Sequence, residues 1–148
     1  MERILGIDLG DRRIGFAVSD ALGITAQGLE TYTRAADDPA ADVEYAISMA
    51  KKHSASSIVF GMPRNMDGSY GFASDKVKDF AKLVSERYDG KISFFDERLS
   101  TVSAERVLCD AKLDWKKRRK VVDKLAAVVI LQAYLDSGAH TSAQNSIV

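Results

Sequence analysis

The order of strand-like and helix-like segments restricts the fold of this chain more than any other feature of its sequence. Two apolar runs, residues 3–7 and 14–19, are separated by a short connection that contains Gly10, Asp11, Arg12 and Arg13. A connection of this length favours an antiparallel hairpin. Residues 29–33 form a third run of the same kind. We therefore expect the chain to open with three antiparallel strands.

Helices alternate with short strands after this opening. Asp38 is expected to cap a helix that has Pro39 at its first position and ends near residue 53. Together with the opening strands, this alternation predicts an α/β fold with a mixed five-stranded sheet flanked by helices. The later elements are expected to be a strand at 58–60, a helix beyond 71, a strand at 92–95, a short helix at 101–109 and a long helix at 116–136.

Length and charge set limits on function. A chain of 148 residues is the usual size of one domain, and we expect residues 1–138 to form it, with 139–148 as a loose tail. Lys and Arg (21) balance Asp and Glu (21), so attraction to nucleic acid has to come from local basic clusters. No apolar run approaches the roughly 20 residues that cross a bilayer. Cys109 is the single cysteine and Met1 leads into a strand without a signal-peptide pattern, so we expect a cytoplasmic protein with no membrane partner.

Three carboxylates occupy positions where a charge is costly. Asp8 follows the first apolar run, Glu97 follows residues 92–95, and Asp123 opens the apolar stripe of the last helix. A charge at the edge of a core is unfavourable unless it is hydrogen-bonded, paired or bound to metal. The carboxyl ends of parallel strands meet at one edge of an α/β sheet, which brings Asp8 and Glu97 together. With Asp123 they form an oxygen ligand set for Mg²⁺ or Mn²⁺, which points to phosphodiester hydrolysis.

Ordinary structural roles are alternatives for each of these residues. An Asp at a strand end often pairs with a neighbouring Arg, and Arg12, Arg13 and Arg98 are available to Asp8. Asp123 could complement the helix dipole or pair with a nearby Lys. The basic run at residues 116–120 most often forms a solvated helix face, although its closeness to Asp123 also suits phosphate contact.

Four motifs in this chain resemble those of the YqgF/RuvX family, a family named both for Holliday junction resolution and for cleavage of pre-16S ribosomal RNA. The resemblance extends from about residue 3 to 136 and keeps the order of the motifs. At two positions where family members often have proline, this chain has Gly28 and Phe72. These differences concern the geometry of a loop and of a helix start, not the acidic residues. The motifs are residues 7–15 (IDLGDRRIG), 61–68 (GMPRNMDG), 96–101 (DERLST), and 123–127 (DKLAA) with 130–135 (ILQAYL).

This resemblance implies a ribonuclease H-like fold and a nuclease that depends on Mg²⁺ or Mn²⁺. The family's acidic residues match Asp8, Glu97 and Asp123 here, which would be both catalytic and metal-binding. Gly6 and Gly10 would keep side chains clear where the substrate backbone approaches. The residues expected to contact substrate are Arg12, Arg64, Asn65, Arg98, Lys116, Lys117, Arg118 and Arg119.

The substrate and the partners stay open at this stage. Precursor 16S rRNA, processed at its 5′ end during ribosome biogenesis, is the favoured substrate, and a branched DNA junction is the alternative. A non-catalytic RNA-binding factor for ribosome assembly is a rival from another class, and ribosomal particles are then a partner. The Asp8-Leu9-Gly10 start also resembles actin-like ATPases and sugar kinases, whose second domain does not fit in 148 residues. Both a monomer and a homodimer are compatible with the sequence.

Overall fold

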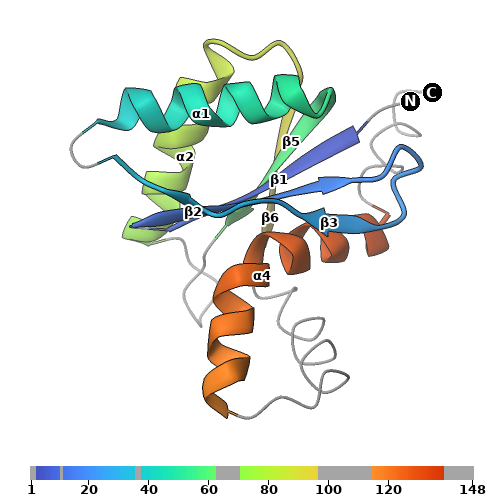
Figure 1. Ribbon diagram of the computed structural model, residues 1–148. Coiled ribbons are helices and arrows are strands. Elements are labelled where there is room, and N and C mark those ends of the chain that lie inside the picture. Colours follow the sequence, from blue (N-terminus) through green and yellow to red (C-terminus); the bar gives the residue numbers. More distant parts are fainter. Residues whose placement is uncertain (1–2, 11, 36–37, 63–70, 97–114, 139–148) are drawn as a thin grey trace.

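The computed structural model describes residues 3–10, 12–35, 38–62, 71–96 and 115–138 (Figure 1). Within these residues the chain forms one six-stranded sheet and three helices. The elements are β1 (Arg3–Leu9), β2 (Arg13–Ser19), β3 (Ala26–Gly28), β4 (Tyr32–Thr33), α1 (Pro39–Lys52), β5 (Ala55–Met62), α2 (Phe72–Ser85), β6 (Lys91–Asp96) and α4 (Trp115–Asp136).

The sheet has the mixed arrangement expected from the element order. Its strands lie in the order β3-β2-β1-β5-β6, and β4 also pairs with β2. The predicted hairpin is confirmed, because β1 and β2 are antiparallel. β1, β5 and β6 run parallel to one another. Their carboxyl ends therefore lie at the same edge of the sheet, where α/β folds usually build their sites.

The third predicted strand, residues 29–33, is wrong in its bounds. Two shorter strands, β3 and β4, take its place, and both pair with β2. Between them the Leu29 N–H still donates a hydrogen bond to the Phe16 carbonyl at 2.9 Å. The edge of the sheet is thus interrupted rather than lost, and the sheet counts six strands where five were expected.

The helices begin and end close to the predicted positions where the structure describes them. Asp38 caps α1 as expected, since its Oδ1 accepts the Ala41 N–H at 3.1 Å. α4 begins one residue before the predicted helix and ends at the predicted residue, Asp136. The helix predicted at residues 101–109 and the tail at 139–148 lie outside the described residues. No helix in the described part of the chain is long and apolar enough to cross a membrane.

Helices cover both faces of the sheet, so the protein has three layers (Figure 1). α1 and α2 pack on one face, over odd-numbered residues of β1 such as Leu5 and Ile7. α4 packs on the other face, where Ile4 contributes to a second cluster around Leu131. Because successive side chains of a strand point to opposite faces, the parity of a residue in β1 decides which core it joins.

Candidate active site

Asp8 lies at the carboxyl end of β1, the middle strand of the order β3-β2-β1-β5-β6. It is the next-to-last residue of β1 and is half-buried. Asp8 has the same parity as Ile4 and Gly6, which contact the α4 side of the sheet. β2 and β5 hold this strand from both sides. The predicted carboxylate is therefore held on a rigid strand and faces the layer that contains α4.

Small residues let α4 come close to Asp8. Gly15 pairs with Asp8 across the β1–β2 ladder. A Cβ atom on Gly15 would lie 3.4 Å from the Ala127 Cβ and 3.7 Å from the Asp8 Cβ. Ala127 of α4 is therefore a near neighbour of Asp8. Asp123 is four residues before Ala127 in the same helix, which is about one turn.

The other predicted site residues are placed in part by the structure. Glu97 lies outside the described residues, but Phe95, two positions earlier in β6, packs on the α4 face against Tyr134 with ring centroids 5.9 Å apart. Arg12 is exposed in the turn between β1 and β2. Arg64, Asn65 and Arg98 lie outside the described residues. Four basic residues are in the first turns of α4: Lys116, Lys117, Arg118 and Arg119.

The two glycines expected to leave room for substrate have other roles. Gly6 lies beneath α4, because a Cβ at this position would be 2.9 Å from the Leu131 Cβ. Gly10 belongs to a tight turn in which an added Cβ would come within 2.7 Å of the Arg13 carbonyl oxygen. The substrate-approach interpretation is therefore wrong for Gly6, which is covered by the helix. For Gly10 the turn alone explains the glycine.

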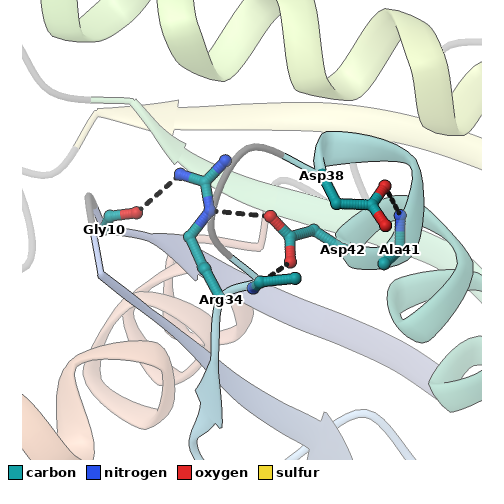
Figure 2. A network of polar contacts seen from close by, with 6 residues as sticks. Gly10, Arg34, Asp38, Ala41 and Asp42 are labelled. Carbon is teal, nitrogen blue, oxygen red and sulfur yellow. Dashed lines mark hydrogen bonds and ion pairs between the residues drawn. The ribbon is translucent and has the colours of Figure 1, made fainter.

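A polar network that sequence reasoning missed lies on the opposite face of the same edge (Figure 2). Arg34 donates from Nε to Asp42 Oδ2 at 2.9 Å and from Nη1 to the Gly10 carbonyl at 2.9 Å. The Ala35 N–H donates to Asp42 Oδ1 at 3.1 Å. Partial burial raises the pKa of Tyr32, and a hydrogen bond to Asp42 raises it further. The sequence signal was an Asp on the apolar face of α1, four positions before Ala46.

A hollow of about 750 Å³ lies beside this network, on the α1 and α2 face. Arg12, Arg34 and Lys76 line it together with the carboxylates of Asp38, Asp42 and Asp79. The charges in its wall balance, and Leu9 and Phe80 make part of it apolar. Asp8 does not line it, because Asp8 and Leu9 point to opposite faces of β1. The hollow and the predicted acidic site are thus separate features of one sheet edge.

The chemistry of the predicted ligand set suits a hard divalent cation. Three carboxylates supply oxygen donors, which Mg²⁺ and Mn²⁺ prefer. Asp8 has the half-exposed position that such a ligand needs, and Gly15 and Ala127 place no bulky side chain beside it. The structure describes the side chain of Asp8, whereas those of Glu97 and Asp123 lie outside the described part. The described residues contain no group of three or more Asp, Glu, His or Cys arranged to hold a metal.

Comparisons with known proteins agree with the sequence motifs. A protein of Halalkalibacterium halodurans named "Putative pre-16S rRNA nuclease" is 49% identical over 134 residues, which cover 90% of this chain and 96% of the relative. A protein of Clostridium perfringens with the same name is 48% identical over 134 residues, with 90% and 96% covered.

Solved structures support the fold. RuvC of Thermus thermophilus in complex with a Holliday junction substrate superimposes with a TM-score of 0.57 at 12% identity, covering 93% of this chain and 97% of that one. The fowlpox virus Holliday junction resolvase gives 0.52 at 14% identity, covering 91% and 99%. The fold is thus ribonuclease H-like, as expected. The family described as "RuvX: Holliday junction resolvase" matches residues 2–137, and the chain belongs to this family.

Proposed function

We propose that this protein is a nuclease that hydrolyses phosphodiester bonds in precursor 16S rRNA, at the 5′ end, with Mg²⁺ or Mn²⁺ as cofactor. The observation that carries the proposal is the position of Asp8. It stands at the carboxyl end of the central strand, next to Ala127 of the helix that also contains Asp123. A carboxylate held in place at this edge of an α/β sheet suits a metal-assisted phosphoryl-transfer site.

Asp8, Glu97 and Asp123 would hold the metal in this site. A bound divalent ion supplies charge stabilisation at the phosphate and lowers the pKa of a bound water. The backbone of Asp8 is restricted, because Asp8 pairs with Gly15 of β2 and the preceding residue, Ile7, pairs with Phe60 of β5. Glu97 would complete the ligand set from the strand that ends beside β5.

Basic and polar side chains would guide the substrate backbone to this edge. Arg12 is exposed in the turn that follows β1 and Asp8, so it is available to a phosphate. The basic residues at 116–119 occupy the start of α4, which Figure 1 shows projecting away from the sheet. Such contacts position a nucleic acid without reading its sequence. Arg64, Asn65 and Arg98 complete the proposed substrate-binding set.

RNA is favoured over branched DNA by the names of the relatives at 48–49% identity. The family description favours the DNA junction as the second candidate. The proposed setting is the cytoplasm, with precursor rRNA or ribosomal particles as partners. A resolvase would act as a homodimer that cuts both strands symmetrically, whereas RNA processing also suits a monomer.

One experiment tests the activity and compares both substrates. Purified protein is incubated with an RNA carrying the 16S 5′ leader and, separately, with a four-way DNA junction, each with Mg²⁺ or with a chelator. We expect Mg²⁺-dependent cleavage of the RNA, reduced by at least about a hundredfold in Asp8→Asn. Asp79→Asn is the matched control, because it makes the same chemical change on the other face of the sheet.

The possible results separate the alternatives. Cleavage of the junction but not of the RNA would replace rRNA processing with DNA resolution. Tight RNA binding without cleavage would indicate a non-catalytic assembly factor. Equal activity of Asp8→Asn and the wild type would remove Asp8 from the site and with it the basis of the proposal.

A further inference from the structure

We infer that Arg34 is a positioning residue for Asp8, which it holds in place by tying the β1–β2 turn to a buried carboxylate of α1. The inference rests on the proposed nuclease function and adds a residue to it. Arg34 is outside the four sequence motifs and is on the face of the sheet away from Asp8. It therefore acts through the backbone and not by touching substrate or metal.

Two contacts of Arg34 join it to the turn that follows Asp8. Its Nη1 donates to the carbonyl of Gly10, two residues after Asp8, at 2.9 Å (Figure 2). Its backbone N–H donates to the Arg12 carbonyl at 2.9 Å. One residue thus holds the turn at both ends. The planar guanidinium presents several donors in a fixed geometry, so it can serve the turn and a second partner at once.

That second partner is firmly anchored. Asp42 is 1% exposed and accepts the Arg34 Nε at 2.9 Å and the Ala35 N–H at 3.1 Å. It lies in the first turn of α1, where the helix dipole favours a negative charge. α1 itself packs on β5 and α2. A buried carboxylate that accepts a hydrogen bond at each oxygen, on a packed helix, is a fixed point from which the turn can be held.

The turn is short enough to pass a displacement on to Asp8. The Gly10 N–H donates to the Arg13 carbonyl at 2.9 Å, which closes the turn. The next pairs in the ladder are Leu9 with Ile14 and Asp8 with Gly15. Without the Arg34 contacts, the end of the hairpin would move more freely. A misplacement of about 1 Å can cost about a hundredfold in rate, so a looser hairpin end would reduce turnover.

The test compares two variants that each remove a side-chain hydrogen bond to a backbone carbonyl. Arg34→Lys keeps the charge beside Asp42, but a single ammonium cannot hold Asp42 and Gly10 in the same fork. Tyr88→Phe is the control, because the Tyr88 hydroxyl donates to the Ala55 carbonyl at 2.8 Å at the start of β5, the opposite edge of the sheet. Both variants are assayed at a temperature where circular dichroism shows them fully folded.

The expected effect is on turnover and on metal affinity. Mutation of a residue that orients a metal ligand typically lowers metal affinity or activity by about 10- to 100-fold. We therefore expect Arg34→Lys to lower kcat about tenfold and to weaken Mn²⁺ binding about tenfold. KM for the RNA should be unchanged, as should the salt dependence of RNA binding. Tyr88→Phe should match the wild type in kcat, KM and Mn²⁺ affinity. Calorimetry with Mn²⁺ alone measures the affinity without reference to cleavage.

Three results would overturn the inference. The first is wild-type kcat and Mn²⁺ affinity in Arg34→Lys. The second is a raised KM with a flatter salt dependence, which would make Arg34 a phosphate contact. The third is an equal loss in Tyr88→Phe, which would reduce Arg34 to a general stabilising role. If the wild type cleaves neither substrate, the proposed function fails, and Mn²⁺ affinity alone then decides whether Arg34 positions the Asp8 site.

Discussion

Replacing Gly6 by alanine tests how closely α4 must approach the sheet. Gly6 lies in the middle of β1 on the α4 face, and an added Cβ would be 2.9 Å from the Leu131 Cβ and 3.4 Å from the Ala127 carbonyl oxygen. The Ala127 oxygen is part of the helix backbone, and the Leu131 Cβ is the first atom of its side chain. A change of rotamer therefore cannot relieve the contact, and either the helix or the strand has to move.

The size of the effect follows from this distance. Ordinary Cβ contacts begin near 3.4 Å, so the two Cβ atoms must separate by about 0.5 Å more. Extra methyl groups in a packed core cost about 1–3 kcal/mol. Replacing Gly by Ala recovers about 0.4–1 kcal/mol by restricting the unfolded chain. We expect the free energy of unfolding to fall by about 1–2 kcal/mol, which lowers Tm by roughly 3–6 °C in a domain of this size.

Denaturant melts and a cleavage assay measure the two consequences. Because α4 also contains Asp123, a displaced helix should reduce the proposed kcat by about tenfold. Gly28→Ala is the matched control, since its added Cβ would meet only the Val128 Cγ2, a side-chain end, at 3.2 Å. That variant should stay within about 0.5 kcal/mol of the wild type. An unchanged or raised free energy of unfolding in Gly6→Ala would refute the argument that α4 is seated on this glycine.

Two further predictions concern charge. Replacing Lys116, Lys117 and Arg118 by alanine should weaken RNA binding without moving the cleavage site. The salt dependence of binding should flatten by roughly one unit of slope for each lost phosphate contact. An unchanged slope in a filter-binding titration would mean that these residues form a solvated helix face. Burial raises the pKa of Tyr88 above its ordinary value of 10.0. The folded protein therefore binds this proton more tightly than the unfolded chain, and the resulting stability is complete below pH 10 and lost as the pH rises beyond it. Alkaline melts of wild type and Tyr88→Phe should show a smaller loss above pH 10 in the variant, and equal losses would contradict the assignment.

Local signals in the sequence were sufficient for most of the fold. The hairpin and the start of α1 were predicted correctly, because a short connection and an Asp-Pro pair act through neighbouring backbone groups. The third strand was placed wrongly because its limits depend on pairing with β2. Gly28 pairs with Ala17 and Thr33 pairs with Arg13, and no pattern within residues 26–33 reveals these two registers.

The candidate site was predictable to the extent that its residues interrupt apolar patterns. Asp8 stands out as a charge at the end of a buried strand, and the structure places it on the α4 face. Asp42 gave a weaker signal, because an acid in the first turn of a helix is usually explained by the helix dipole alone. The role of Gly6 could not be predicted, since it depends on contact with Leu131 near the other end of the chain.

The position of α4 in the chain has a consequence for synthesis. The layer formed by α1 and α2 is built from residues that precede residue 97, whereas the opposite face of the sheet receives its helix from residues 115–136. The amino-terminal part of a chain emerges from the ribosome first. A chain that ends before residue 115 therefore lacks α4, the helix that covers Ile4, Val59 and Phe95, and it also lacks Asp123. Under the proposed function, such a chain lacks one of its three metal ligands, so nuclease activity is expected only after α4 has been synthesised.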